Sequence, residues 1–319
     1  MTTGPRRARV DALAKINLAL KVLNKRPDGY HELRTVYQTI SLADRIEIEF
    51  TPARRTSIDL SSSIDIPDNL MLRAARVTMD AMRVTGRVNM KLTKRIPAGA
   101  GLGGGSSDAA AVLLALPALA GGWISMPEQI GLATVLGSDV PFFLMGGTAV
   151  GVGRGAELYP LPDRSPSHGL LIAPGIHVST PEAYSGLGRE LTSAVPANII
   201  NIFQSFAWFE EQQTPARGKP VPPENDFEGS VFLQHPRLKS LKARLHRLGA
   251  EPAMMTGSGS ALFGLFRERV DLEKVLPLFR KETVFEFSLV NRARYRRAWL
   301  RRLAGHVEGE LWPPRSRYL

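Results

Sequence analysis

The 319-residue chain contains no cysteine, which excludes disulfide bonds and every cysteine-ligated metal site. It also lacks a long apolar run, because the longest one, residues 109–120, is too short to span a bilayer and contains Pro117. The N-terminal arginines are not followed by the apolar segment of a secretory signal. Hydrophobic residues make up 44% of the chain and charged residues 22%, as in globular proteins. These features predict a cytoplasmic, globular protein.

Acidic residues are fewer than basic ones, and the resulting net charge of +11 is unevenly distributed. Residues 1–9 carry three arginines and no acid, and residues 288–319 carry eight arginines against two glutamates. The rest of the chain is nearly neutral, which argues against a nucleic-acid surface built into the fold. We predict that residues 292–319, whose pattern is helical to Leu303, form a solvated or disordered extension, and contact with an acidic partner stays open.

A glycine-rich stretch, residues 97–108, reads PAGAGLGGGSSD and leads into alanine- and leucine-rich sequence with good helix propensity. A helix start offers free N–H groups and a partial positive charge, and glycines let backbone approach a ligand closely. The stretch therefore predicts a phosphate-binding loop. The residues expected to contact the nucleotide there are Pro97, Gly99, Gly101, Gly103, Gly104, Gly105, Ser106 and Ser107.

Two familiar nucleotide motifs do not account for this stretch. A dinucleotide fold needs an acidic residue about 20 positions further on; the first acid after the predicted helix is Glu128, beyond a Gly-Gly break. A P-loop needs a lysine after the last glycine, and none follows. A plain surface turn is the remaining alternative, but five glycines within seven positions would make it entropically costly.

Alternating and helical patterns predict a chain of mixed α and β structure. Strict alternation over residues 10–22 predicts a strand that carries Lys15 and Asn17 on one face. Further strands are predicted at 44–50, 88–92, 146–153, 169–173 and 284–290, a strand–turn–strand unit at 254–266, and helices at 69–84, 109–116, 126–136, 180–184 and 238–248, the first of these helices capped by Asp68-Asn69.

Four features carry potential chemistry, and each has a plainer alternative. Lys15 lies in a strand, where most lysines point to solvent. Asp139 precedes Val-Pro-Phe-Phe; it is either a functional acid against apolar surface or an ordinary turn aspartate. Tyr30 and His31 follow a Pro-Asp-Gly turn and could stack on a nucleobase or pack on a sheet edge. Residues 256–260, TGSGS, form a second anion-binding nest or a tight turn.

Taken together and in this order, the motifs resemble the GHMP kinase superfamily. The glycine-rich stretch and residues 256–261 are similar to the superfamily at large. Three further segments resemble the erythritol kinase branch of the superfamily: residues 15–18, 26–33 and 137–142. Residues 225–228 are a further tetrad similar to that family.

The resemblance covers about residues 9–291 and implies a two-domain α+β fold with the active site between the domains. It implies a ribosomal protein S5 domain 2-like N-terminal domain, residues 1–160, with a left-handed βαβ unit. A ferredoxin-like C-terminal domain would follow over residues 161–291, and residues 292–319 would be a basic tail. The proline-rich stretch at 203–223 departs from the family pattern, so the substrate-side wall would differ there.

The resemblance also implies an activity: ATP- and Mg²⁺-dependent phosphorylation of the 2-hydroxyl of 4-diphosphocytidyl-2-C-methyl-D-erythritol, in non-mevalonate isoprenoid synthesis. Asp139 would take the hydroxyl proton and Lys15 would assist it. Tyr30 and Tyr184 would sandwich the cytosine and His31 would bind its edge. The other implied contacts are Asn17 near the reacting hydroxyl, Thr180 on the cytidine side, Asn69 and Lys94 near adenine, and Ser107 at the Mg²⁺–phosphate cluster.

The expected partner is the small cytidylyl substrate, with no membrane or nucleic acid, for a monomer or homodimer. Two alternatives remain open. One is a GHMP kinase that acts on a sugar, homoserine or mevalonate, which would not need a cytosine clamp. The other is a non-catalytic protein with the same fold and a basic tail that binds RNA.

Overall fold

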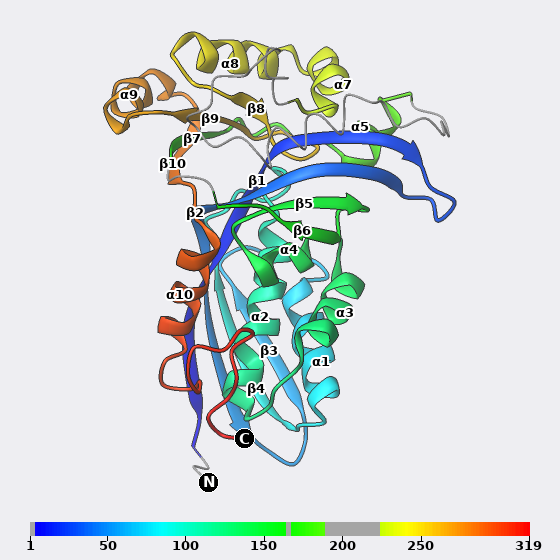
Figure 1. Cartoon of the computed structure of the whole chain (residues 1–319), viewed down its shortest axis with the longest axis vertical. Coiled ribbons are helices and arrows are strands. Elements are labelled where there is room, and N and C mark those ends of the chain that lie inside the picture. Colours follow the sequence, from blue (N-terminus) through cyan, green and yellow to red (C-terminus); the bar gives the residue numbers. More distant parts are fainter. Residues whose placement is uncertain (1–3, 164–166, 189–223) are drawn as a thin grey trace.

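The computed structural model describes residues 4–163, 167–188 and 224–319 and contains two β-sheets with helices packed on them (Figure 1). The first sheet has the strand order β3-β4-β2-β5-β6, and β1 pairs with β2. Its strands are β1 (Arg6–Lys25), β2 (His31–Pro52), β3 (Ser57–Ser62), β4 (Gly86–Thr93), β5 (Thr148–Gly153) and β6 (Glu157–Pro160).

Helices cover one face of this sheet and form a core with it (Figure 1). They are α1 (Leu70–Met82), α2 (Gly104–Ala120), α3 (Met126–Leu136) and α4 (Val140–Met145). The central helix α2 is buried from Ser107 to Ala120, because alanine and leucine occupy nearly all of its surface. It runs one turn beyond the predicted end and includes Pro117. Proline cannot donate to the carbonyl of Leu113, which accepts the Gln129 side-chain amide at 3.4 Å instead.

The segment between β3 and β4 forms the predicted βαβ unit. β3 and β4 pair in parallel, so α1 crosses from the end of one strand to the start of the next. The predicted cap at the start of α1 is confirmed, because the Asn69 side chain accepts a hydrogen bond of 3.0 Å from the N–H of Met71.

The second sheet has the antiparallel order β10-β7-β9-β8, the order of a ferredoxin-like domain, and confirms that prediction. Its strands are β7 (His168–Ala173), β8 (Ala253–Met255), β9 (Leu262–Phe266) and β10 (Thr283–Ser288). The helices that accompany it are α5 (Thr180–Ser185), α7 (Phe227–Gln234), α8 (Pro236–Arg247), α9 (Arg269–Val275) and the short 3-10 helix η1 (Leu276–Phe279).

The long strands β1 and β2 connect the two layers (Figure 1). Val10 and Ile46 belong to the core beneath α2, whereas Leu20 and Leu33 belong to the core of the second sheet. The predicted division near residue 160 remains a prediction, and the proline-rich stretch at 203–223 lies outside the described residues.

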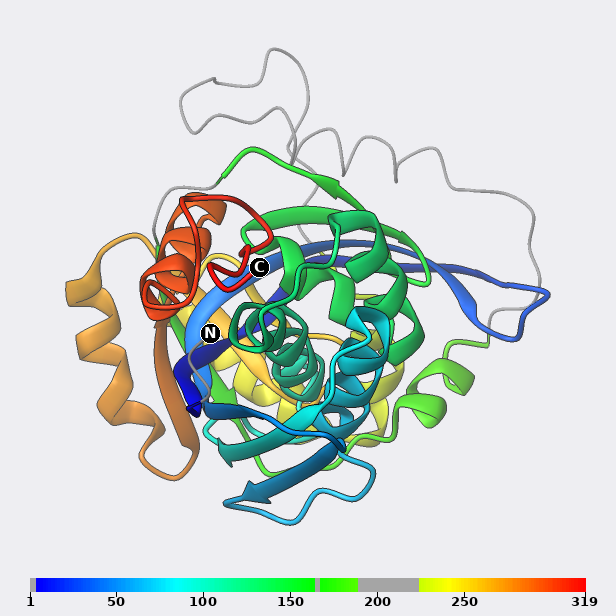
Figure 2. The ribbon, with the colours of Figure 1, turned by 90° about the horizontal axis from the view of Figure 1, so that it is seen from below.

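The prediction that residues 292–319 form a solvated or disordered extension is wrong. The segment forms α10 (Arg292–Arg302) and then lies against the helices of the first layer (Figure 2). Tyr295, Trp299 and Leu303 are buried in that core. They are spaced four residues apart and share one face of the helix, so the arginines between them can point outward.

The remainder of the C-terminal segment is fixed by specific contacts. The indole N–H of Trp312 donates to the carbonyl of Leu144 at 3.0 Å, and the Ser316 hydroxyl donates to that of Ala118 at 2.8 Å. The Arg6 guanidinium lies 3.9 Å from the centre of the Tyr318 ring, so the two chain ends pack together. The basic composition of this segment predicts that it is exposed to solvent, but the helical spacing of its aromatic residues lets it pack against the core.

None of the helices in the described residues is long and apolar enough to cross a membrane.

The packing of α10 predicts that replacing Trp299 and replacing Trp123 change the free energy of unfolding by very different amounts. Trp299→Ala should lower the free energy of unfolding by about 3–5 kcal/mol, because it leaves a cavity in the core. Trp123→Ala is the matched control, since Trp123 is 50% exposed, and should change it by less than about 1 kcal/mol. Urea denaturation followed by circular dichroism measures both. Equal, small effects would mean that α10 does not stabilise the fold.

Candidate active site

A cavity of about 920 Å³ lies where β1 and β2 pass from one layer to the other. Its lining comes from both layers, including α5, the start of α7 and the turn between β8 and β9. The structure brings both predicted catalytic residues and all predicted substrate-binding residues to this cavity: Lys15, Asn17, Tyr30, His31, Asp139, Thr180 and Tyr184.

Lys15 and Asp139 lie next to each other in this cavity. The Lys15 ammonium is 3.5 Å from the Asp139 carboxylate and donates a 2.7 Å hydrogen bond to the side-chain oxygen of Asn17. Lys15 is 3% exposed, so it does not point to solvent as an average strand lysine does. A shift of the β1–β2 register between Leu13 and Lys15 accompanies this inward orientation.

Tyr37 of β2 is a site residue that the sequence analysis missed. Its hydroxyl donates a 3.0 Å hydrogen bond to the second carboxylate oxygen of Asp139. Burial, with the adjacent Asp139 charge, raises the pKa of Tyr37 well above 10, so the hydroxyl remains a donor. Tyr37 pairs with Asn17 across β1 and β2, and this position could indicate its role only if the register of the two strands were known.

Asn17 connects the strand β1 to the TGSGS segment. Besides the Lys15 ammonium, its side-chain oxygen accepts the Thr256 hydroxyl at 3.2 Å and the Gly257 N–H at 2.9 Å. Its amide nitrogen donates to the hydroxyl of Thr35 at 2.7 Å. Every polar group of this buried side chain is therefore used, which fixes its orientation.

The family-like tetrad at 225–228 supports the same turn from the other side. The amide nitrogen of Asn225 donates to the carbonyls of Met255 and Gly257, at 2.8 and 2.9 Å. Glu228 accepts the N–H of Met255 at 2.8 Å. Residues 225–228 therefore stabilise the TGSGS segment, which fixes the Asn17 side chain.

The glycine-rich loop approaches this turn at van der Waals distance. Gly99, Gly101 and Gly103 have φ values of +65°, +79° and +67°, a region that favours glycine. A Cβ on Gly101 would lie 2.2 Å from the carbonyl oxygen of Thr256. Gly103 begins α2 without a side-chain cap, so the first N–H groups of this buried helix are free of side-chain competition.

The predicted nucleotide residues lie along the loop and beneath it, and none of them lines the 920 Å³ cavity. The Ser107 hydroxyl donates to the carbonyl of Leu13 at 2.7 Å. The Lys94 ammonium is 2.9 Å from the Asp108 carboxylate and also pairs with Asp44. Burial raises the pKa of Asp108 to about 7, although the Lys94 charge opposes the shift. Pro97 and Ser106 are half-buried, and Asn69 caps α1.

The aromatic end of the cavity differs in detail from the implied clamp. His31 stacks on Tyr184, with ring centres 4.6 Å apart and planes at 22°. Tyr30 is half exposed and faces the guanidinium of Arg154, which is 4.5 Å from its ring centre. Burial and the charge of Lys25 lower the pKa of His31, which favours its neutral form. Burial also raises the pKa of Tyr184 to about 12.

Two cations of the cavity, Lys25 and Arg154, were not predicted. Lys25 ends β1, and Arg154 follows β5, so they are distant in the sequence. Among the described residues neither is engaged in an ion pair. They give the aromatic end a positive charge.

Comparison with known proteins agrees with this geometry. Family models for the GHMP kinases N terminal domain and the GHMP kinases C terminal match residues 69–147 and 209–279. A crystal structure of 4-(cytidine 5'-diphospho)-2C-methyl-D-erythritol kinase superposes with a TM-score of 0.72 at 36% identity, covering 88% of this chain and 98% of that one. Homoserine kinase from Cytophaga hutchinsonii shares the fold, with a TM-score of 0.66, 16% identity and coverage of 89% and 95%. Fold and site therefore define a GHMP kinase.

Full-length relatives narrow this class further. The 4-diphosphocytidyl-2-C-methyl-D-erythritol kinase of Solibacter usitatus is 56% identical over 98% of both chains. That of Porphyromonas gingivalis is 39% identical, over 85% of this chain and 97% of the relative. The chain belongs to the 4-diphosphocytidyl-2-C-methyl-D-erythritol kinase family.

Because the glycine-rich loop approaches the TGSGS segment closely, replacing Gly101 and replacing Gly105 should affect stability differently. Gly101→Ala should lower the free energy of unfolding by about 2–4 kcal/mol, through a strained φ and a clash with Thr256. Gly105→Ala is the control, because a Cβ there meets nothing within 4 Å and the position is helical. It should be neutral or stabilising by up to about 1 kcal/mol. Thermal unfolding measures both, and a stable Gly101→Ala variant would contradict the observed packing.

Proposed function

We propose that the protein transfers the γ-phosphoryl group of ATP to the 2-hydroxyl of 4-diphosphocytidyl-2-C-methyl-D-erythritol, a step of non-mevalonate isoprenoid synthesis. The observation that carries the proposal is the paired Lys15 and Asp139 in one cavity with stacked aromatic rings, beside a glycine loop that starts a buried helix. The family relationship supports the same substrate.

Asp139 acts on the reacting hydroxyl. An alcohol is too weak an acid to attack at neutral pH, so a carboxylate in reach takes its proton as the new O–P bond forms. The bond between the γ-phosphorus and the β,γ-bridging oxygen breaks, and ADP leaves. Lys15 stabilises the negative charge that develops on the attacking oxygen, and the Tyr37 hydroxyl holds one oxygen of Asp139 in place.

The glycine loop suits the phosphates of ATP. Phosphoryl transfer needs mainly positioning and charge stabilisation, which the free N–H groups at the start of α2 supply. No group of three or more His, Asp or Glu side chains in the described part of the chain is arranged to hold a metal ion. Mg²⁺ would therefore arrive on the nucleotide phosphates, and Ser107 retains a lone pair for it while it donates to Leu13.

The opposite end of the cavity suits a cytidine diphosphate. The rings of Tyr30, His31 and Tyr184 offer faces on which a base can stack. Lys25 lies opposite His31 in the β1–β2 register and Arg154 lies over the Tyr30 ring, so both cations line the aromatic end and suit the negative charge of the diphosphate. Thr180, whose hydroxyl lies 3.0 Å from that of Ser258, is a neighbouring polar contact.

Other GHMP kinase substrates fit this cavity less well. Homoserine and mevalonate carry neither a base nor a diphosphate, so they would leave the aromatic rings and both cations unused. The fold alone does not discriminate, because homoserine kinase shares it at 16% identity. We further propose that the enzyme works in the cytoplasm, for which a chain without cysteine is suited.

Asp139→Asn should lower kcat about 10²- to 10⁴-fold, the usual contribution of a positioned general base. The affinity for a non-hydrolysable ATP analogue should stay unchanged, because Asp139 acts at the acceptor. Steady-state kinetics and calorimetric titration give the two quantities. A kcat close to that of the unsubstituted enzyme would remove Asp139 from the mechanism.

Tyr30→Ala should weaken binding of the cytidylyl substrate by about 1–3 kcal/mol, the usual energy of a stacked base. Tyr159→Ala is the control, because Tyr159 is similarly exposed, at 54%, and lies outside the cavity. KM for the cytidylyl substrate and for ATP should be measured for both variants. A rise confined to the KM for ATP would show that the two binding regions have been exchanged.

A further inference from the structure

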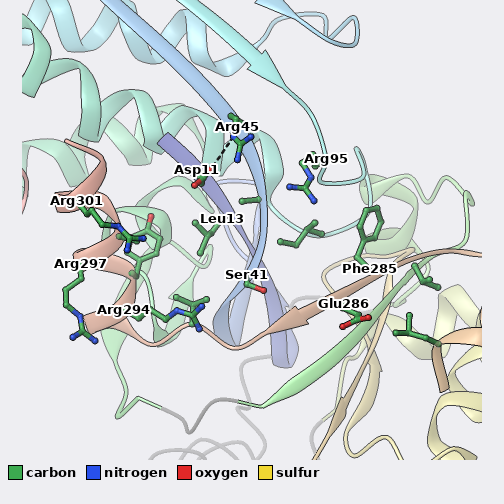
Figure 3. A pocket seen from close by; sticks show the side chains of 17 residues that line it. Asp11, Leu13, Ser41, Arg45, Arg95, Phe285, Glu286, Arg294, Arg297 and Arg301 are labelled. Atoms are coloured by element: carbon green, nitrogen blue, oxygen red, sulfur yellow. Dashed lines mark hydrogen bonds and ion pairs between the residues drawn. The ribbon is translucent and has the colours of Figure 1, made fainter. Parts of the chain in front are cut away.

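A second cavity, of about 1050 Å³, lies between α10, the paired strands β1 and β2, and the edge strand β10 (Figure 3). It shares no lining residue with the candidate active site. In Figure 3, Arg294, Arg297 and Arg301 of α10 stand on one side, whereas Arg95 and Phe285 stand on the other. The kinase reaction proposed above uses none of these residues.

Basic side chains dominate the charge of this cavity. Five arginines line it, Arg45, Arg95, Arg294, Arg297 and Arg301, against two carboxylates. One of these, Asp11, is already paired with Arg45, at 3.4 Å, and with Arg302. The other, Glu286, lies on the β10 side.

Among the residues that the structure describes, four of the five arginines have no carboxylate partner. Within residues 4–163, 167–188 and 224–319, no ion pair involves the side chains of Arg95, Arg294, Arg297 or Arg301. Residues 288–319 carry eight arginines against two glutamates, and a cavity lined by this excess has a positive field that attracts an anion. Guanidinium groups also bind phosphate in a bidentate geometry.

The helix that carries three of these arginines is rigidly attached. The Asn291 side chain accepts the N–H of Arg294 at 2.7 Å and caps α10. Tyr295 and Trp299 of the same helix are buried in the core, and the Tyr295 hydroxyl donates to the carbonyl of Phe143. The backbone that carries these exposed arginines is therefore fixed in position beside the cavity.

The rest of the lining is largely apolar. Leu13, Leu42, Val290 and Tyr295 contribute to it, with Leu276, Val284 and Phe285 opposite. A cavity of this size that combines apolar side chains with charged ones can hold a small molecule. Arginines along one helix are also the charge pattern of a nucleic-acid surface, but the apolar side chains of this cavity favour a compact ligand.

We propose that this cavity binds a small organic phosphate, one whose phosphate group contacts the arginines of α10 and whose apolar or aromatic body packs on the leucine and aromatic side chains. The site is separate from the one that binds ATP and the phosphoryl acceptor.

The probe that tests the proposal is 1-naphthyl phosphate, with inorganic phosphate for comparison. Binding to the full-length protein is followed by fluorescence and calorimetry, and is repeated with Tyr30→Ala, a change in the kinase site alone. We expect a site for 1-naphthyl phosphate that Tyr30→Ala leaves unchanged and that binds the probe more tightly than inorganic phosphate and more weakly as salt increases. Arg294→Gln/Arg301→Gln should weaken binding about tenfold or more.

Arg73→Gln/Arg76→Gln is the matched control, because it removes the same charge from two exposed arginines of α1 that line neither cavity. It should leave binding of the probe unchanged. Equal weakening in both double variants, or loss of probe binding in Tyr30→Ala with binding retained in the α10 variant, would overturn the proposal. So would a short RNA that binds more tightly than the probe and loses its affinity in the α10 variant, because the surface would then be one for nucleic acid.

Discussion

The site depends on one buried charge, the ammonium group of Lys15. An ammonium that is 3% exposed would be very unfavourable without partners, since the energy of removing it from water must be balanced. The Asp139 carboxylate and the Asn17 side-chain oxygen supply that balance. Both partners are themselves held, Asp139 by Tyr37 and Asn17 by the turn at Thr256. These hydrogen bonds hold the Lys15–Asp139 pair in position in the absence of a substrate.

Strand β1 distributes the functions along its length. Leu13 lines the arginine cavity, Lys15 and Asn17 line the active site, and Leu20 belongs to the second core. A regular strand would place Leu13, Lys15 and Asn17 on one face. The register shifts after Leu13 and after Asn17 change which face each residue presents, so one strand serves two cavities.

The predictions from sequence succeed where the information is local. The Asn69 cap, the loop that begins α2 and the strand order of a ferredoxin-like sheet depend on nearby residues or on family resemblance. The contacts of Tyr37 and Arg154 could not be predicted, because each joins elements whose register and packing only the fold determines. The C-terminal segment shows a different failure. Its many arginines favour a solvated tail, although three apolar residues at helical spacing decide that it packs on the core.

The stacked pair of His31 and Tyr184 constrains how a cytosine can enter the cavity. Ring centres 4.6 Å apart leave no space for a third ring between them, so a base must either stack on an outer face or separate the pair. Separating two aromatic rings loses about 0.5–1.5 kcal/mol, whereas stacking a base regains about 1–3 kcal/mol. The stacking of one base can therefore offset the loss of the ring pair. The Tyr30 ring contacts the Arg154 guanidinium rather than another ring, so a base that stacks on it separates no ring pair. Under the proposed function, a base that stacks on an outer face therefore leaves the ring pair intact, and the neutral His31 can accept or donate a hydrogen bond at the base edge.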